Sequence, residues 1–485
     1  MNKFRPDHHA PQAQDYFQTR RQFLSRYGTG FGLLGLASML EPDLINPNAE
    51  AAKSFSPLAV KKPHFQARAK RVIHIFAQGA PSHLDTWDYK PSLTRYDAAR
   101  GGDMNGKPLP DIGGVAFASP VDYIKRGQSG VPVAEIWPEL GKHIDDIAVI
   151  NSMHTDIPAH EFASVMMNTG SGRLVKPSMG SWVTYGLGSE NQNLPGFISL
   201  TPGGGPPGGS ENWRSAFLPG SFQGTHINTR EPRVERLIEN IKNNYISMPE
   251  QRQQLDLLHQ LNAVHSLNLK KEEQLEARIQ AFELAFKMQT EATEVFDISK
   301  EPQSVRDMYG DTAQGRQMLI ARRLLEKGVR FVQAWHGGWD HHSNLDTAIR
   351  NKAREVDQPI AAFIKDLKNR GMFEETLIIW SGEFGRTPTR QLPNGNNNFE
   401  VPGRNHNHRG FSAWMAGGGV KGGQRYGATD EFGYRAVSDK VHIHDLHATV
   451  LALLGFDHEK LTYRYNGRDF RLTDVYGNVV RDVIA

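Results

Sequence analysis

Six short apolar runs are spaced along the chain, and glycine and polar residues follow each run at once. The runs with their polar tails occupy residues 71–85, 146–156, 196–205, 328–342, 376–386 and 411–423. Short apolar runs between longer helical stretches predict buried parallel strands. Because ligands bind beyond the carboxyl ends of parallel strands, the polar tails should gather at one edge. We therefore expect an α/β fold with a mostly parallel central sheet sandwiched by helices.

Two helical patterns fill the gaps between these runs. Residues 313–328 carry an apolar stripe and end at Gly328, as expected of a helix packed on the sheet. The stripe comprises Met318, Leu319, Ala321, Leu324 and Leu325. Residues from about 231 to 300 are long, charged and helical in pattern. We predict one α/β domain over residues 52–485, with a helical insertion at about 231–300.

The amino terminus has the pattern of an export signal. Thr19–Ser25 reads TRRQFLS, a twin-arginine pattern, and residues 28–40 form a weakly apolar segment. Ala49-Glu50-Ala51 offers a cleavage site. The apolar segment is diluted by glycine and shorter than the roughly 20 residues that a membrane span needs. We expect residues 1–51 to be a signal peptide that the twin-arginine translocase recognises, and the mature protein to be periplasmic or secreted without a membrane span.

The charge balance and the cysteine content limit the kinds of partner and metal site that the protein can have. The chain has 56 basic and 53 acidic residues, so no strong field marks it as a binder of nucleic acid or anionic membrane. A small-molecule partner is expected instead. The chain has no cysteine, which excludes disulfides and thiolate zinc sites. Any metal ion must be held by nitrogen and oxygen ligands.

Two histidine clusters are candidates for such a metal site. Asp340, His341 and His342 lie in GGWDHHSN, directly after one of the apolar runs. His406 and His408 lie two residues apart, just before another run, and would point the same way in an extended segment. Carboxylate and imidazole groups suit a divalent cation. Each cluster could instead be a turn held by local hydrogen bonds.

Further candidates follow other strands. Asp85 and Glu383 could each be a metal ligand or a general base. Arg386 could clamp an anionic substrate or pair with Glu383. Ser82 and Thr155 are candidate nucleophiles, provided that they lie against an ion or a base; otherwise they are ordinary cap or turn residues.

The set of motifs resembles a known family. The motifs are the twin-arginine signal, APSHLDTWDYKP, ELAFKMQTEATEVFDISKEP, LIARRLLEKGVRFVQ, GGWDHHSN, SGEFGRTP and GRNHNHRGFSAWMAGGGVKGG. Together they are similar to the exported bacterial family called domain of unknown function 1501 (DUF1501), a relative of the sulfatases in the alkaline phosphatase superfamily. This resemblance implies a mostly parallel sheet between helices and one or two divalent ions at its carboxyl edge. It also implies a hydroxyl or formylglycine nucleophile.

The resemblance also implies two ligand sets. Asp340 with His342 or His341, joined by His406 or His408, would hold one ion, which could be zinc, calcium, magnesium or manganese. Asp85 and Glu383 would supply carboxylates to a second ion. Two ions about 4 Å apart would brace the attacking and leaving oxygens of an in-line displacement. The superfamily's usual Asp-His-Gly is Glu383-Phe384-Gly385 here, which removes one imidazole, so the site is expected to be mononuclear or reshaped.

These observations predict a metal-dependent hydrolase of sulfate or phosphate esters, acting on exported carbohydrate substrates. Arg386 or a histidine would steady the anion. Formylglycine forms from Cys or Ser in a C/S-x-P/A-x-R context, which is missing from this chain. An unmodified hydroxyl or a metal-bound water would then attack, which favours phosphoester-type chemistry. The alternative is a catalytically silent metal- or glycan-binding protein on the same scaffold.

Overall fold

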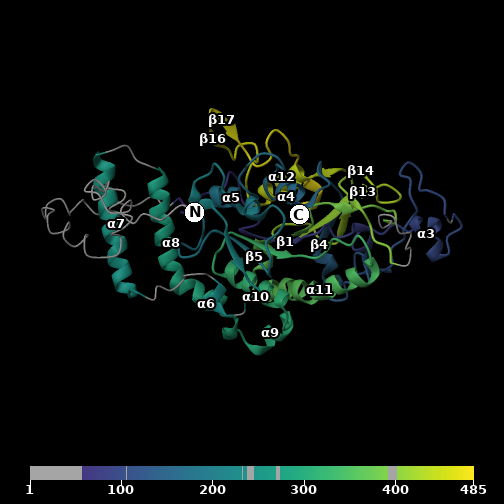
Figure 1. Cartoon of the computed structure of the whole chain (residues 1–485), viewed down its shortest axis with the longest axis horizontal. Helices are drawn as coiled ribbons and strands as arrows, with labels where there is room; N and C mark the ends of the chain where they lie inside the picture. Colours follow the sequence, from purple (N-terminus) through teal and green to yellow (C-terminus); the bar gives the residue numbers. More distant parts are fainter. Residues whose placement is uncertain (1–56, 105, 232, 238–244, 269–272, 392–400) are drawn as a thin grey trace, which may run out of the picture.

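A nine-stranded sheet forms the centre of the computed structural model (Figure 1). The structure describes residues 57–485 except 105, 232, 238–244, 269–272 and 392–400, so the predicted signal peptide lies outside the described residues. The strand order is β12-β4-β11-β8-β1-β7-β5-β6, and β15 pairs with β4. The strands are β1 (Arg71–Ala77), β4 (Ile147–His154), β5 (Phe197–Thr201), β6 (Thr225–Asn228), β7 (Phe331–His336), β8 (Thr376–Ser381), β11 (Phe411–Ala416), β12 (Gln424–Tyr426) and β15 (Val441–His442).

The directions of the strands confirm a mostly parallel sheet and correct one detail. β1, β5, β6, β7 and β8 run parallel to their neighbours in that group, and β12 and β15 run parallel to β4. β11 is antiparallel to both β8 and β4, so its prediction as a parallel strand is wrong. An antiparallel neighbour needs no helical crossover, and the chain reaches β11 from the carboxyl edge. His406 and His408 therefore reach this edge because they precede β11.

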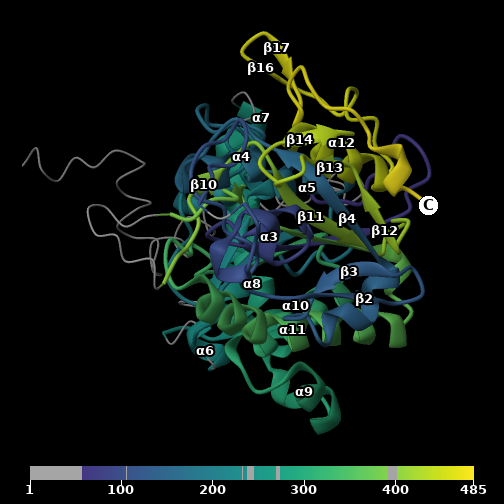
Figure 2. The same cartoon turned by 90° about the vertical axis from the view of Figure 1, so that its right-hand side faces the viewer.

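Both faces of the sheet are buried, which explains the apolar runs. In β1, Ile73 and Ile75 face one hydrophobic cluster, whereas Val72 and Phe76 face the other. The first cluster packs against α10 (Ala313–Glu326) and α11 (Leu345–Asn369). The second packs against α4 (His160–Thr169), α5 (Met179–Leu187) and α12 (Ile443–Leu453). Figure 2 shows α11 and α12 on opposite sides of β4 and β11, so the predicted helix-sheet-helix sandwich is confirmed.

The helix predicted over residues 313–328 is α10. Thr312 caps it by accepting a hydrogen bond from the Gly315 amide, and all five residues of the predicted stripe are buried. Gly328 follows the helix with φ +86°, a left-handed conformation that glycine adopts without a steric cost. The helix end is therefore set by the residue that the sequence indicated.

Long helices occupy the segment predicted as an insertion. α6 (Val234–Leu237), α7 (Met248–Asn268) and α8 (Glu273–Phe296) cover its described part, and Figure 1 shows α7 and α8 side by side at one end of the molecule. The end of α8 joins the first hydrophobic cluster through Val295 and Phe296. The helical character is thus confirmed, whereas the division into a domain and an insertion stays a prediction.

Smaller elements complete the described chain. They are α3 (Ser92–Tyr96), β2 (Tyr123–Arg126), β3 (Val131–Ala134), α9 (Gln303–Tyr309), β9 (Gly385–Arg386), β10 (His406–Asn407), β13 (Ala428–Thr429), β14 (Ala436–Ser438), β16 (Tyr463–Tyr465) and β17 (Arg468–Phe470). No helix in the described ranges combines the length and the hydropathy needed to cross a bilayer.

Candidate metal centre

Four side chains from separate segments meet at the carboxyl edge of the sheet. His160 begins α4 after β4, Asp340 and His342 follow β7, and His406 lies in β10. One ligand atom from each lies within 4.8 Å of every other, and within the described chain this is the one such group of His, Asp or Glu residues. We call these four residues the ligand group.

Oδ1 of Asp340 is the centre of the ligand group. It lies 2.8 Å from Nε2 of His342, 3.2 Å from Nε2 of His160 and 3.5 Å from Nε2 of His406. The Nε2 atoms of His342 and His406 are 3.1 Å apart. All three imidazoles thus direct the same nitrogen toward one carboxylate oxygen.

The opposite nitrogen of each imidazole explains this orientation. Each Nδ1 lies within hydrogen-bond distance of an oxygen that can only accept, so Nδ1 can donate to that oxygen while Nε2 is directed at Asp340 Oδ1. The acceptors are Glu383 Oε1 at 2.5 Å for His160, Gln391 Oε1 at 2.5 Å for His342 and the Pro158 carbonyl at 2.9 Å for His406. Nε2 atoms that converge on a carboxylate oxygen are favourable only where a proton or a metal cation lies between them. Metal-binding histidines are held by such outer hydrogen bonds.

The pKa values show how strongly the site favours positive charge. Burial lowers the pKa of His160, but hydrogen bonds to Asp340 and Glu383 outweigh it and raise the pKa to about 9. Burial raises the pKa of Asp340, but hydrogen bonds from His160, His406 and Arg386 hold it well below its usual range. A protonated His160 thus places one positive charge between these two carboxylates. A divalent ion bound to Nε2 would serve the same purpose, so the residues present fit a metal.

Asp340 is held in place by a tight backbone contact. A Cβ atom on Gly79 would lie 2.6 Å from the Asp340 amide nitrogen, and Gly79 has φ +106°. Only glycine therefore allows the loop after β1 to approach Asp340 this closely. Arg386 hydrogen-bonds to both Asp340 and the Gly79 carbonyl, which joins the two segments.

Glu383 lies behind His160 and outside the ligand group. It is fully buried, and its Oε1 accepts hydrogen bonds from His160 and from the Gly79 amide at 3.0 Å. Its Oε2 has no hydrogen-bond partner among the described residues. Glu383 thus contacts His160 and the Gly79 amide, whereas the resemblance implied a direct ligand of a second ion.

Replacing Glu383 with glutamine should weaken metal binding by roughly 10–100-fold, the usual effect of losing such an outer partner. The amide keeps the size of the side chain but removes the charge that stabilises the Nδ1 proton of His160. Titration of metal-free protein with Zn²⁺ measures the change, and Glu374→Gln on the surface serves as the control. Unchanged affinity would show that His160 needs no anionic partner.

Asp85, which was expected to be a metal ligand, is paired with an arginine. Asp85 and Arg404 are both fully buried, with Nε 2.7 Å from Oδ2 and Nη2 3.0 Å from Oδ1. Ser82 donates its hydroxyl hydrogen bond to the same carboxylate. Both oxygens of Asp85 are thus occupied, and the residue lies outside the ligand group.

Arg386 also has a different role from the two expected. Its side chain is 1% exposed, so it is not available to a substrate anion. Its donors reach the carbonyls of Gly79 at 2.6 Å, Ala80 at 2.9 Å and Arg404 at 3.2 Å, as well as Asp340. The carboxylate that it pairs with is therefore Asp340 and not Glu383.

The two candidate nucleophiles do not join the ligand group. The Ser82 hydroxyl is bonded to Asp85, and the Thr155 amide donates to the His408 carbonyl at 2.9 Å. The Thr155 hydroxyl is buried and has no hydrogen-bond partner in the described chain. In that part of the chain neither hydroxyl is hydrogen-bonded to a ligand-group residue.

In each pair of candidate histidines, one residue joins the ligand group and the other does not. His342 and His406 join the ligand group, whereas His341 and His408 do not. Burial and then the nearby Arg386 lower the pKa of His341 to about 4. His160 is the one member of the ligand group that is not among the candidates from the sequence. Its position in the segment that follows β4 is the available signal, because the other members of the ligand group also lie near strand ends.

Comparisons with known proteins give one family and several distant folds. A family model described as "Protein of unknown function (DUF1501)" matches residues 69–484. No curated protein matches the chain.

Among solved structures that resemble it, Ps i-CgsB in complex with k-i-k-neocarrahexaose is 12% identical with a TM-score of 0.36, covering 80% of this chain and 72% of that chain. The PsFucS1 sulfatase from Pseudoalteromonas sp. is 13% identical with a TM-score of 0.33, covering 81% and 69%. Alkaline phosphatase from the Antarctic bacterium TAB5 is 10% identical with a TM-score of 0.28, covering 76% and 95%.

Proposed function

We propose, for a chain that belongs to the DUF1501 family of proteins of unknown function, that the ligand group binds one divalent metal ion and that the protein hydrolyses sulfate or phosphate esters. One observation carries the proposal. Three imidazole Nε2 atoms converge on the Asp340 carboxylate, and each opposite Nδ1 is held by an oxygen acceptor.

The ligand types favour zinc or a related transition metal. Three imidazoles and one carboxylate suit Zn²⁺, whereas Ca²⁺ and Mg²⁺ prefer sites built from oxygen ligands. Asp85 is already paired with Arg404, and Glu383 faces His160, so neither supports a second ion. We therefore propose a mononuclear centre.

Charge and exposure support an anionic substrate. Asp340 and Glu383 carry two negative charges and Arg386 one positive charge, so a bound divalent ion would leave the site with a net positive charge. The side chains of Asp340 and His342 are 41% and 37% exposed, which leaves the ligand group open to solvent. A small sulfate or phosphate ester would thus find both access and attraction.

A metal ion bound here would polarise an ester oxygen and acidify a water molecule. The chain's own residues hold the three imidazoles in the ligand tautomer, and Arg386 keeps Asp340 ionised and fixed. Since Ser82 and Thr155 are not hydrogen-bonded to the ligand group, water is the nucleophile that the arrangement favours. We also propose export by the twin-arginine route, on the basis of residues 1–51.

Metal analysis and turnover of generic esters test this function. Purified protein should contain about one equivalent of zinc or a related metal and hydrolyse 4-nitrophenyl sulfate or 4-nitrophenyl phosphate. A chelator should abolish turnover, and added Zn²⁺ should restore it. Metal-loaded protein that hydrolyses neither ester would contradict the hydrolase proposal and favour a metal-binding protein on the same scaffold.

A further inference from the structure

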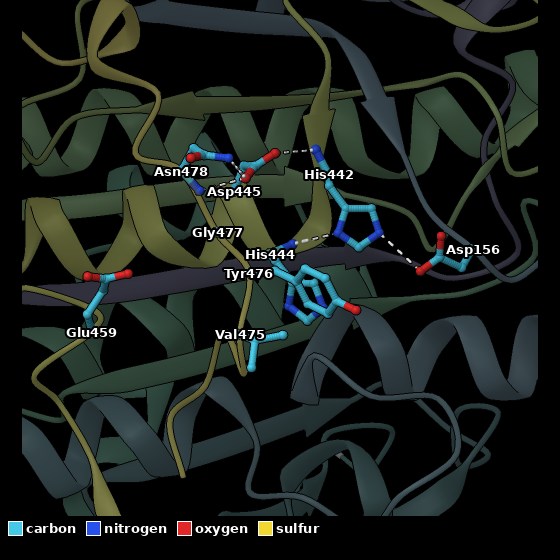
Figure 3. Close-up of a pocket in the computed structure, with 9 residues that line it drawn as sticks. All are labelled: Asp156, His442, His444, Asp445, Glu459, Val475, Tyr476, Gly477 and Asn478. Atoms are coloured by element: carbon cyan, nitrogen blue, oxygen red, sulfur yellow. Dashed lines mark hydrogen bonds and ion pairs between the residues drawn. The ribbon is translucent and has the colours of Figure 1, made fainter. Parts of the chain in front are cut away.

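Figure 3 shows a second place of interest, a pocket of about 600 Å³ beside the start of α12. It is bounded by the loop after β4, the start of α12 and the segment around Tyr476. Its volume falls within the range of small-molecule sites, roughly 300–1,000 Å³. None of the residues predicted from the sequence as site residues lines it.

The walls of this pocket are tied together by hydrogen bonds. The Asp445 carboxylate accepts from the His442 amide at 2.8 Å and from the Asn478 amide at 2.6 Å. Nδ1 of His442 accepts from the His444 amide, so its Nε2 carries the proton and faces Asp156 Oδ2 at 3.3 Å, as Figure 3 shows. Tyr476 stacks on His444 with ring centroids 5.1 Å apart. The pocket is therefore preformed.

The lining combines hydrogen-bond acceptors with an exposed aromatic face. Asp156 and Glu459 have side chains 75% and 65% exposed, and Tyr476 is 61% exposed. Burial, followed by the nearby His447 and His442, lowers the pKa of His444 to about 3, so its imidazole is neutral. Neither lysine nor arginine lines the pocket, although Arg471 Nη1 lies 3.2 Å from Glu459 Oε1. This chemistry disfavours an anion and suits a ligand with hydroxyl donors and a flat C–H face.

The pocket and the ligand group share one short segment of chain. Asp156 lines the pocket, and His160 belongs to the ligand group only four residues later. Four residues span at most about 14 Å even when fully extended. Between them, the Pro158 carbonyl accepts a hydrogen bond from His406. A ligand a few sugar units long could therefore contact both places.

We infer that this pocket binds a neutral sugar unit of the ester whose charged group is directed to the ligand group. The part of this inference that concerns the ester rests on the proposed function. The binding of a sugar by the pocket is independent of it. The carboxylates of Asp156 and Glu459 accept hydrogen bonds from sugar hydroxyls, and Tyr476 packs against the apolar face of the ring.

Titration with neutral oligosaccharides tests this inference. The full-length protein is titrated with tetrasaccharides of glucose, galactose, mannose and N-acetylglucosamine, with binding followed by saturation-transfer NMR. At least one should bind, and Tyr476→Ala and Asp156→Asn should each weaken that binding at least about tenfold. Tyr465→Ala, at a tyrosine 42% exposed on β16 outside the pocket, should leave it unchanged.

The outcomes separate this inference from the proposed function. His342→Ala should lose metal while keeping sugar binding, because His342 does not line the pocket. Absence of binding by all four sugars, or binding that the pocket variants do not alter, would overturn the inference. If tetramethylammonium binds to the parent protein and its binding is lost in the same variants, the pocket is a cation site instead. Failure of aryl-ester turnover alone would overturn only the proposed hydrolase activity and not the binding of sugar.

Discussion

Replacing His406 with alanine should weaken Zn²⁺ binding by more than about 100-fold, beyond the effect of losing an outer partner. His406 supplies one of three converging Nε2 atoms, and its side chain is 23% exposed, so its removal should leave the fold intact. Asp340→Ala should have at least as large an effect, because Asp340 supplies the only carboxylate of the ligand group. Titration of metal-free protein with Zn²⁺ measures both changes, and circular dichroism checks folding.

His408→Ala is the matched control for His406→Ala. Both histidines belong to NHNH in the sequence, but only His406 joins the ligand group. We expect His408→Ala to bind Zn²⁺ as the parent protein does. Equal loss in both variants, or no loss in either, would contradict the assignment of ligands.

Replacing Arg404 with alanine should destabilise the protein by about 3–5 kcal/mol, because it leaves the Asp85 carboxylate buried without its counter-ion. Both side chains are fully buried and share two hydrogen bonds. Urea unfolding measures the free energy of unfolding. Arg435→Ala removes a surface arginine that is 53% exposed and 3.5 Å from Asp430, so it should cost less than about 1 kcal/mol.

Substitution of Asp85 tests whether this residue is a metal ligand. Asp85→Asn should lower stability while the metal content stays unchanged. The opposite result, loss of metal with little change in the free energy of unfolding, would restore Asp85 as a ligand and imply a larger centre than the four-residue group.

The central strands could be predicted because burial on both faces makes each an unbroken apolar run. The direction of β11 could not, since a buried strand has the same pattern in either direction. Its direction depends on the edge at which the chain re-enters the sheet after β8. This difference matters for function, because it puts His406 rather than the glycines after β11 at the edge with Asp340.

The sequence predicted the residue types of the candidate site better than the individual residues that form it. Asp340, His342 and His406 were among the candidates, but local turns decide which member of each histidine pair faces Oδ1. Asp85 and Arg404 are 319 positions apart, and Arg386 and Asp340 are 46 apart. Partners this distant carry no local pattern, so the sequence could not show that these charges are already paired.

Anomalous X-ray diffraction from crystals of the protein grown with Zn²⁺ tests the central claim most directly. A single strong peak should lie about 2.0–2.2 Å from Nε2 of the three ligand-group histidines and from an oxygen of Asp340. A peak at Asp85 or Glu383, or crystals with Zn²⁺ bound only elsewhere, would contradict the claim that these four residues form the metal centre.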